Sequence, residues 1–499
     1  MKKATNEFLS EIEKISQKRK YDILNSNTEV RITGNAYYVS NSGDDDNDGR
    51  TPETPWKTLN KVSDEDLNVG DGVFFRRGDL FRGSVICKAG VTYSAYGEGI
   101  KPRFYGGDKN LANSSLWELY DKEHNIWKLT EKILDCGTLV FNDGEKHSRK
   151  LIPSYRNSKF VCREDETRIF ELANEMTCDL DIFCSYTEKL STTPSKNEDF
   201  PIPVLDGTSY GDLYLRCDAG NPADVFDSIE PIARHSLFSC TGNNVTIDNM
   251  CMKYACFGVS GGGELLEGLH VTNCEIGWIG GNIQHYTGED PNYPQGKRGT
   301  VTRFGNGIEI YGGCRDYIVN NCYVYQVYDA GMSHQITTHG STFKMEDIKY
   351  INNLIEYCVY GIEYFLEKNK GDTKSYIKDC EMANNIIRFS GYGWGQQRHN
   401  IYTPALIKGW SYENTAYNYT IHDNIFDRAA YRMLHLVAKK KESCPLMSDN
   451  TYINKLGQTL GQYGANEVEE PANHSYDERT EEIVNKVFGD ETAKVYYVV

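Results

Sequence analysis

The chain has 499 residues, a net charge of −17 at pH 7 and a mean hydropathy of −0.58. It contains no apolar run of about 18 residues, the length that crosses a bilayer, and no extended cluster of Lys and Arg that would suit a phosphate backbone. We therefore expect neither a membrane span nor a nucleic-acid partner. At this length the chain can form two or three average domains or one long solenoid.

The cysteines predict a reducing environment. Fifteen occur in the chain, with no C-x-x-C pair and no metal-ligand spacing. Cys274 and Cys322 stand where equivalent phrases carry Leu or Ile, so we expect small buried thiols rather than a disulfide framework. The basic residues after Met1 are not followed by an apolar run, so the sequence shows no signal peptide. These features predict a cytoplasmic protein, or a secreted one if a leader has been trimmed.

Residues 1–30 have a helical pattern, in which Phe8, Ile12 and Ile15 share one face. We expect a helix that packs on the first turn of the fold as a cap. The alternative is a docking segment for a helical helper subunit or domain.

Residues 36–107 carry short strand-like runs. Ala36-Tyr37-Tyr38-Val39-Ser40 is followed by a turn rich in Asp, Asn and Gly and then by Pro55-Trp56-Lys57-Thr58-Leu59. This pattern resembles the first segment of bacterial pectate-lyase-like β-helix proteins that act on carbohydrate. The resemblance implies a right-handed parallel β-helix and a carbohydrate ligand.

The turn at 43–49 invites a calcium interpretation. Asp44, Asp46, Asp48 and Gly49 match the first half of a Ca²⁺ loop, but its twelfth position is Pro55 rather than Glu. We therefore expect a polar turn, with no metal and no cofactor, and Ca²⁺ as the less favoured alternative.

The rest of the chain divides by its rhythm. Residues 108–235 break the pattern with long polar loops and predict an inserted β-rich subdomain. Residues 236–455 carry the central β-helix and its active face. Residues 456–499 form a C-terminal cap, with a helix over 477–488 and a final strand.

An asparagine phrase recurs seven times between residues 249 and 450, at intervals of 24 to 48 residues. Each copy is an Asn followed by a short hydrophobic run. A loose period of this length in a β-branched, Asn-rich and Gly-rich chain is typical of stacked rungs. The fold class we predict is all-β, a parallel β-helix. The copies contain Asn249, Asn273, Asn321, Asn353, Asn385, Asn424 and Asn450.

Strand alternation then predicts which side chains share a face. In Gly307-Ile308-Glu309-Ile310 the isoleucines face the core, so Glu309 points outward. Each of the next two rungs repeats the Gly-apolar phrase of Gly307-Ile308, as Gly331-Met332 and Gly361-Ile362. Alignment on this phrase places Ser333 and Glu363 beside Glu309, and Asp329 has the same outward parity. A single outward carboxylate is usually only solvated, but three on consecutive rungs predict a site.

Paired carboxylates are the catalytic groups of most glycosidases, one as acid and the other as base or nucleophile. Glu309, Asp329 and Glu363 are therefore the candidate catalytic residues. One rung separates groups as in a retaining enzyme and two rungs as in an inverting one, so both outcomes stay open. Hydrogen-bonding and aromatic side chains near this patch are the candidate sugar-binding residues. They are His285, Gln335, Tyr364, Trp394, Gln397, Arg398, Lys408, Trp410 and His435.

The rungs also contain irregular intervals. The segments 286–304 and 366–376 interrupt the repeat, and we expect them to form walls over the patch.

Several rung phrases resemble those of lacto-N-biosidase-type β-helix glycosidases of gut bacteria. They are Asn306–Gly313, Tyr325–Gly331, Gly361–Phe365, Gly391–Trp394 and Thr403–Ala405. The resemblance implies release of lacto-N-biose from milk-type oligosaccharides by two carboxylates, assisted by a helical N-terminal domain or a helper subunit. That family has two aspartates seven residues apart; here the residue seven after Asp329 is Ile336, and Glu309 and Asp316 have the spacing without both being Asp.

The sequence thus predicts a glycoside hydrolase that acts on an oligosaccharide. One alternative is a lyase or epimerase acting on a uronan, in which Lys408, Arg398 and His435 would carry the chemistry. Another is a glycan-binding subunit without activity.

Overall fold

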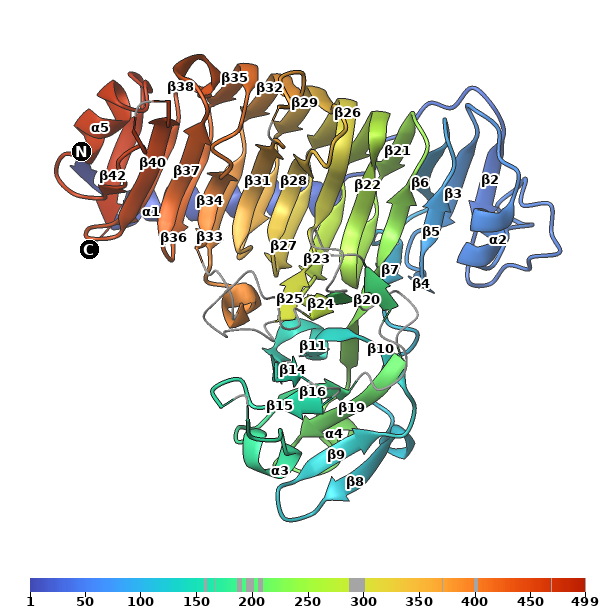
Figure 1. The fold of residues 1–499 in the computed structure, drawn as a ribbon. Coiled ribbons are helices and arrows are strands. Elements are labelled where there is room, and N and C mark those ends of the chain that lie inside the picture. Colours follow the sequence, from blue (N-terminus) through green and yellow to red (C-terminus); the bar gives the residue numbers. More distant parts are fainter. Residues whose placement is uncertain are drawn as a thin grey trace.

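The structure is a computed structural model that describes residues 1–156, 159–165, 167–185, 191–193, 202–204, 210–286, 301–369, 371–398, 403–467 and 469–498. The chain winds as a right-handed parallel β-helix whose rungs stack along one axis (Figure 1). The predicted fold class is confirmed.

Each rung contributes to three parallel sheets. Sheet 1 contains β5 (Val85–Cys87), β20 (Ile229–Cys240), β22 (Cys251–Thr272), β26 (Ile308–Asn320), β28 (Ala330–Thr337), β31 (Tyr360–Glu367), β34 (Ala405–Gly409), β37 (Arg432–Ala438) and β40 (Thr459–Ala465). Sheet 2 contains β2 (Ala36–Val39), β3 (Gly72–Arg76), β6 (Thr92–Tyr96), β21 (Val245–Asp248), the later parts of β22 and β26, β29 (Lys344–Ile351), β32 (Tyr376–Ala383), β35 (Ala416–His422) and β38 (Leu446–Ser448). Sheet 3 contains β4 (Leu80–Arg82), β7 (Arg103–Tyr105), the start of β22, β23 (Glu275–Ile279), β27 (Tyr323–Val327), β30 (Leu354–Glu356), β33 (Ile386–Ser390), β36 (Ile425–Ala429), β39 (Thr451–Lys455), β42 (Lys494–Val498) and β1 (Lys2–Lys3).

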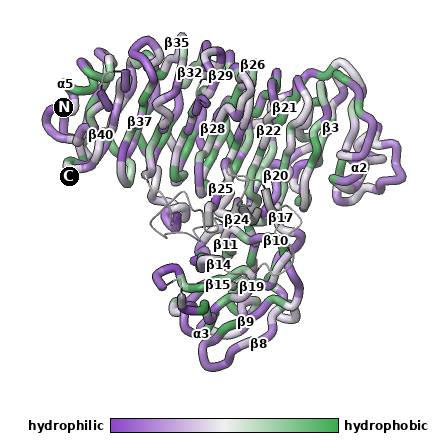
Figure 2. The backbone as a smooth tube through the Cα atoms, in the orientation of Figure 1, coloured by the Kyte–Doolittle hydropathy of each residue, from purple (hydrophilic) through white to green (hydrophobic). Residues whose placement is uncertain are grey.

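The interior is filled by stacked apolar side chains. In sheet 1, Ile308, Met332, Ile362 and Leu434 occupy one register column with Ile407, and all are fully buried. Figure 2 shows the apolar segments concentrated on the strands and the hydrophilic ones at the turns. Burial of this continuous column is the main favourable term for stacking the rungs, at about 25 cal/mol per Å² of apolar surface.

An asparagine ladder lines the corner between sheets 2 and 3. In the last four copies the residue before the repeated Asn has a left-handed backbone, with φ of 60° at Asn352 and 55° at Asn384, which Asn tolerates better than most residues. In the first three copies the repeated Asn itself has this backbone, with φ of 54° at Asn273. The repeated Asn of each of the last four copies is buried. The backbone N–H and the side-chain amide of Asn353 both donate to Asn385 Oδ1 at 3.0 Å, and Asn385 donates in the same way to Asn424. Asn424 continues the ladder to Asn450.

The N-terminal helix does not cap the first rung. α1 (Asn6–Leu24) runs along sheet 3 from the C-terminal end of the solenoid toward its middle (Figure 1). Ile23 packs against Tyr323, Leu354 and Ile386, and Phe8 stacks on Tyr496 at 4.0 Å between ring centroids. The predicted place for this helix is wrong, because the apolar outer surface of sheet 3 gives its apolar face a better partner than the end of the stack.

The remaining elements lie at the ends and on one side. α2 (Leu59–Asp64) packs on the first rungs, and α5 (Thr480–Lys486), shorter than expected, lies in the C-terminal cap. A second body projects from the solenoid (Figure 1). Its mainly antiparallel sheet contains β8 (Trp117–Asp121), β9 (Ile126–Leu129), β10 (Ile133–Leu134), β13 (Arg149–Lys150), β16 (Asp181–Ser185) and β19 (Tyr210–Arg216), with α3 (Leu172–Glu175) and α4 (Pro222–Val225) beside it. β11 (Cys136–Phe141) pairs with both β12 (Lys146–His147) and β20 and so joins this body to the solenoid. A short ladder pairs β14 (Ser154–Arg156) with β15 (Lys159–Val161). A second ladder contains, in order, β17 (Ser191–Thr193), β18 (Ile202–Val204), β24 (Asn282–Tyr286) and β25 (Val301–Phe304).

All fifteen cysteines lie in the described part of the chain as free thiols, and each except Cys178 is buried. Cys274 and Cys322 are buried on neighbouring rungs, as expected. Their predicted alignment with Leu354 is wrong: Tyr323 pairs with Leu354, and Cys322 holds the position of Asn353, to whose Oδ1 its backbone N–H donates. No helix among the described residues has the length and apolar character needed to cross a membrane.

We expect Asn385→Ala to destabilise the fold, because it removes the acceptor for two N–H groups of Asn353 and leaves them buried. Each unpaired buried N–H costs about 1–3 kcal/mol. Urea unfolding followed by circular dichroism measures the loss, with Asn369→Ala, an exposed Asn, as the control. Equal stability of the two variants would show that the ladder does not hold the rungs together.

Replacing Ile23 with Ala is expected to lower the free energy of unfolding by about 2–5 kcal/mol, because it opens a cavity under α1. Ile15→Ala on the same helix is the matched control, since that side chain is 40% exposed. The same unfolding assay applies. If Ile23→Ala lowers the free energy of unfolding no more than Ile15→Ala does, the helix is not packed as described.

Candidate active site

The outward residues of sheet 1 form a column of polar side chains. The strand register aligns Glu309 with Ser333, Ser333 with Glu363, Glu363 with Lys408 and Lys408 with His435. The predicted superposition of Glu309, Ser333 and Glu363 is therefore confirmed. Adjacent strands lie about 4.8 Å apart, so the Cα atoms of Glu309 and Glu363, which are two strands apart, are separated by roughly 10 Å.

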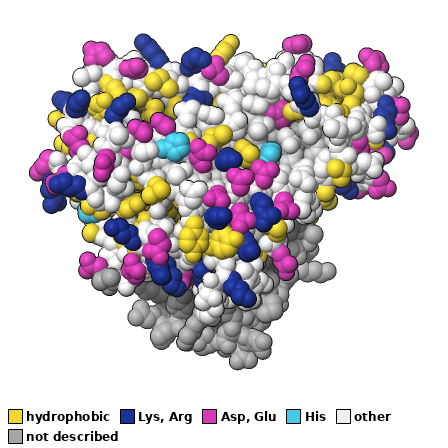
Figure 3. Space-filling model, turned by 90° about the horizontal axis from the view of Figure 1, so that it is seen from above, with side chains coloured by type: hydrophobic (Ala, Val, Ile, Leu, Met, Phe, Trp, Pro, Cys, Tyr) yellow, Lys and Arg dark blue, Asp and Glu magenta, His cyan; other side chains and the backbone are white. Residues whose placement is uncertain are grey.

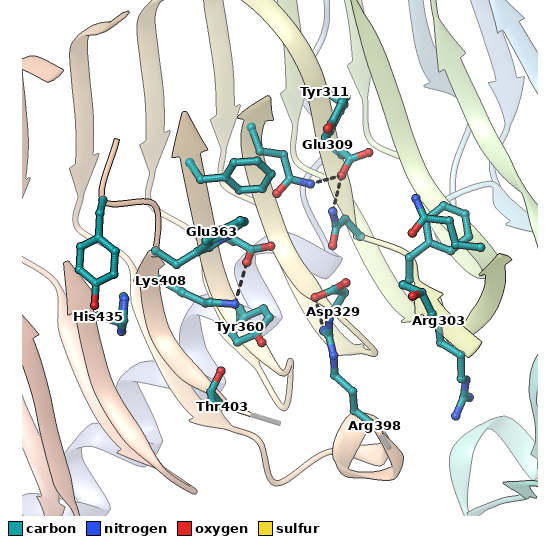
Figure 4. Close-up of a pocket in the computed structure, with 18 residues that line it drawn as sticks. Arg303, Glu309, Tyr311, Asp329, Tyr360, Glu363, Arg398, Thr403, Lys408 and His435 are labelled. Carbon is teal, nitrogen blue, oxygen red and sulfur yellow. Dashed lines mark hydrogen bonds and ion pairs between the residues drawn. The ribbon is translucent and has the colours of Figure 1, made fainter. Parts of the chain in front are cut away.

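This column opens into a cavity of about 560 Å³. Asp329, just before β28, also lines it, and Figure 4 shows the three carboxyl groups turned toward a common space. The cavity is lined by Gln284, Thr302, Arg303, Phe304, Asn306, Glu309, Tyr311, Asp329, Gln335, Tyr360, Glu363, Phe365, Arg398, Thr403, Lys408, Trp410, Tyr412 and His435.

Glu309 is a buried acid whose hydrogen-bond partners are neutral amides. It accepts hydrogen bonds from the side-chain amides of Asn306 and of Gln335, the latter at 2.6 Å. Asn306 is oriented for this by the backbone N–H of Ala330, which donates to its Oδ1 at 2.8 Å. Burial raises the pKa of Glu309 to about 7; the two amides act against this rise, and the charges of Asp329 and Glu363 add to it. Within the described part of the chain, Glu309 forms no ion pair.

Asp329 and Glu363 each have a cation. Arg398 Nη1 lies 2.5 Å from Asp329 Oδ1, and Lys408 Nζ lies 3.2 Å from Glu363 Oε1. Burial raises the pKa of Glu363, against the charge of Lys408, and the negative charge of Asp329 adds to the rise. Burial works against the charge of Arg398, but the neighbouring Asp329 outweighs it and raises the pKa of that guanidinium.

Tyr360 connects the two cations. Its ring lies 3.8 Å from Lys408 Nζ and 5.5 Å from the Arg398 guanidinium carbon. Cation–π contacts of this kind hold both cations over the ring and leave their hydrogens for the paired carboxylates.

His435 is a neutral donor at the end of the column. Burial, together with the charges of Arg432 and Lys408, lowers its pKa to about 3. Arg432 Nη1 donates to His435 Nδ1, so the ring proton belongs on Nε2. His435 Nε2, Gln335 Oε1 and the Tyr360 hydroxyl are buried without a hydrogen-bond partner among the described residues. Buried polar atoms of this kind are uncommon in folded proteins, and all three belong to residues that line the cavity.

Aromatic rings form a second column two residues further along the strands. Phe365 lies 6.5 Å from Tyr311 and 4.4 Å from Trp410 between ring centroids. Tyr311 is exposed and Trp410 half-buried. The cavity therefore has an apolar wall beside its carboxylates, on which the C–H face of a sugar can pack.

Three predicted binding residues lie elsewhere. Tyr364 is an inward residue whose ring stacks on His334 and Tyr419 in the core, as strand alternation after Glu363 requires. Trp394 is 1% exposed, packs on Tyr328 and donates its indole N–H to Gln326 O, so its ring is not presented to a ligand. Gln397 donates to Ser148 O and accepts from Lys150 N, which ties η3 (Trp394–Gln397) to the inserted subdomain. These three predictions are wrong.

The other predicted binding residues can be placed as follows. Gln335, Arg398, Lys408, Trp410 and His435 line the cavity. His285 lies in β24, paired with β25, but its side chain is outside the described part of the structure. The expected wall at 286–304 is described only at its end, where Thr302, Arg303 and Phe304 line the cavity, and residues 287–300 lie outside the description. No described residue of 366–376 lines it, so the second expected wall is wrong.

Sequence reasoning missed Asn306 and Tyr360. Asn306 directly precedes the Gly307-Ile308 phrase, and this position just before the strand could have marked it as a partner of Glu309. Tyr360 gave no signal, because its contacts come from two rungs and a loop. Asp316, seven residues after Glu309, lies in sheet 2 beside His270 and takes no part in the site.

The acidic turn at 43–49 is internally bonded. Asp48 Oδ1 accepts from Arg50 N and Thr54 Oγ1, and Asp44 Oδ1 accepts from Asp46 N. Among the described residues, no three His, Cys, Asp or Glu side chains gather in a way that could hold a metal ion. On the face seen in Figure 3, Lys and Arg alternate with Asp and Glu, which gives no single-sign patch there.

Comparison with known proteins gives the following similarities. No protein-family model matches the chain. The chain is 39% identical over 122 residues to a lacto-N-biosidase of Bifidobacterium longum subsp. longum, a match that covers 22% of this chain and 8% of that protein. The resemblance stated from the rung phrases is confirmed. The chain thus spans only a small part of the length of this curated relative.

Three solved structures are similar to the chain at a low level. A GH136 lacto-N-biosidase from Eubacterium ramulus matches with a TM-score of 0.35 and 12% identity over 98% of this chain and 71% of the other. A complex of XylC with xylose matches with a TM-score of 0.36 and 12% identity over 93% of this chain and 82% of the other. A glycoside hydrolase matches with a TM-score of 0.42 and 10% identity over 93% of this chain and 96% of the other. At this level of similarity these structures carry no argument about the site.

The buried position of Glu309 makes stability depend on pH. Its pKa in the folded protein lies above the ordinary value of 4.5, so the folded state holds a proton that the unfolded chain has released. The stability contributed by this proton is complete below pH 4.5 and is lost as pH rises through about 7. We expect the melting temperature of Glu309→Gln, relative to that of the wild type, to rise between pH 5 and pH 8. Asp316→Asn serves as the exposed control, and parallel curves for all three proteins would contradict the burial of this acid.

Proposed function

We propose that this protein is a glycoside hydrolase that cleaves a neutral oligosaccharide in the cavity of sheet 1. One observation carries the proposal. Glu309 has a pKa near the working pH of most enzymes and stands beside two carboxylates that are held by cations. Hydrolysis of a glycosidic bond requires this division between a protonated and an ionised carboxyl group.

Glu309 is the proposed proton donor to the leaving oxygen. Its burial raises the pKa to about 7, so the carboxyl is protonated below that pH and in part at neutral pH. The amides of Asn306 and Gln335 fix its orientation. As the glycosidic bond breaks, the proton passes from Glu309 to the departing oxygen, and the resulting carboxylate retains both amide donors. General acid catalysis of this kind contributes about 10²–10⁴ in rate.

Asp329 is the proposed anionic partner. Its charge raises the pKa of both Glu309 and Glu363, which places it electrostatically between them. It can activate water or attack the anomeric carbon, and the ion pair with Arg398 keeps it in place. Glu363, held by Lys408, is the proposed sugar-positioning carboxylate.

Neutral sugars suit this cavity better than uronates. The two cations that a uronate carboxylate would need, Arg398 and Lys408, are already paired with Asp329 and Glu363. The buried polar atoms of His435, Gln335 and Tyr360 offer a donor and acceptors for hydroxyl groups, and the rings of Tyr311 and Trp410 offer apolar faces. The match to a lacto-N-biosidase makes oligosaccharides that contain lacto-N-biose the first substrates to test.

The direct test is a panel of neutral oligosaccharides and uronans, assayed for new reducing ends and for the absorbance of unsaturated products. We expect reducing ends from neutral substrates without the unsaturated chromophore. The chromophore would identify a lyase instead, and binding without either product would identify a glycan-binding subunit.

We expect Glu309→Gln and Asp329→Asn each to lower kcat/KM by about 10²–10⁴. The loss in Glu309→Gln should shrink for aryl glycosides whose leaving group needs no proton, whereas the loss in Asp329→Asn should not. The wild-type kcat/KM should fall as pH rises through about 7, because Glu309 then loses its proton. Asp316→Asn should retain full activity. Near-full activity of both site variants would remove these residues from the mechanism.

A further inference from the structure

A second cavity, of about 820 Å³, opens where α1 ends on sheet 3. Its walls come from the end of α1 at Leu24 and Asn25, the turn before β7, the starts of β22 and β23, and η2 (Asn142–Gly144) of the inserted subdomain. It shares no lining residue with the cavity of sheet 1. This cavity is therefore separate from the cavity of sheet 1.

Four cations line this second cavity in a chain of net charge −17. Lys253 is paired with Glu275 at 3.1 Å. The other three are Arg77, Lys101 and Arg103, and none of them forms an ion pair with a carboxylate in the described part of the chain. Arg77 and Lys101 are 6% and 3% exposed.

Neutral oxygens satisfy these three cations only in part. Arg77 donates to Ser26 O at 3.0 Å and to Gly99 O at 3.3 Å, and Lys101 donates to Ser26 Oγ and Asn249 Oδ1. These bonds fasten the segment that follows α1. Among the described residues, the Arg103 guanidinium donates to one neutral oxygen, Gly78 O at 2.9 Å. The Nε–H groups of both arginines are buried and have no acceptor among the described residues.

The acids in and near the cavity form no ion pair with Arg77, Lys101 or Arg103 among the described residues. Glu98 and Asp143 are exposed, and Asp143 accepts a hydrogen bond from the Tyr254 hydroxyl at 3.3 Å. Buried Asp248 acts on both Arg77 and Lys101, and Glu98 acts on Arg77, but each does so from beyond ion-pair distance. A buried cation without an anion is costly, and arginine forks match oxyanions with two parallel N–H donors.

We infer that this cavity binds the oxyanion of a small ligand, a phosphate, sulfate or carboxylate group, between Arg103, Arg77 and Lys101. The group is either a free anion or part of an acidic saccharide. The open volume beyond the three cations has room for a sugar ring.

Isothermal titration of the intact protein with inorganic phosphate, glucose 6-phosphate and glucose tests this site. We expect both phosphates to bind and glucose alone not to bind. Tighter binding of glucose 6-phosphate than of phosphate identifies an acidic saccharide as the ligand, and equal affinity identifies the free anion. Absence of binding by both phosphates would overturn the inference.

Variants locate the binding. Arg103→Gln should lower the affinity for both phosphates by about tenfold or more. Arg103→Lys, which keeps the charge but loses the two parallel N–H donors of the guanidinium, should lower the affinity by less. Arg76→Gln, on an exposed neighbour in β3, should bind as the wild type. Glu309→Gln should also bind as the wild type, so the result is independent of the proposed hydrolase activity. Equal affinity in Arg103→Gln and Arg76→Gln would place the anion elsewhere and contradict the site.

Discussion

The asparagine ladder is the constraint on which the other features of the solenoid depend. Asn353, Asn385, Asn424 and Asn450 lie buried at the same corner of successive rungs. The side-chain oxygens of the last three each accept from the backbone and side-chain N–H groups of the Asn on the rung before, and that of Asn353 accepts from the backbone N–H of Cys322. A buried amide must be paired, so the chain has to return to the same height and phase at every turn. Between these fixed corners, loops can vary in length without changing the register of the strands.

That register makes a site from residues far apart in sequence. Glu309, Ser333, Glu363, Lys408 and His435 occupy one outward column because the corners fix their rungs. Two cations pair with two of the three carboxylates of the site, so the three carboxylates have different neighbours. Glu309 receives neutral amides, whereas Asp329 and Glu363 receive Arg398 and Lys408. The division of roles between acid and anion follows from these neighbours.

Much of the sheet 1 column could be predicted from sequence, because strand alternation and the Gly-apolar phrase act within one rung. The alignment of Glu309 with Ser333 and Glu363 needed nothing else. Trp394 and Gln397 could not be placed in this way, since their positions depend on packing of η3 against Tyr328 and the inserted subdomain. The interior position of Tyr364 follows from strand alternation, since Tyr364 comes directly after the outward Glu363, so this residue could have been assigned to the core from the sequence. The position of α1 depends on an apolar surface built by three separate rungs, which no local pattern reveals.

The claim that burial keeps Glu309 protonated near neutral pH is tested most directly by NMR. Protein labelled with ¹³C at the glutamate carboxyl carbons can be titrated, and the Glu309 signal identified by its absence in Glu309→Gln. We expect its midpoint near pH 7, with the chemical shift of a protonated acid at pH 5. A midpoint at the ordinary glutamate value of about 4.5 would contradict the proposed division of roles among the three carboxylates.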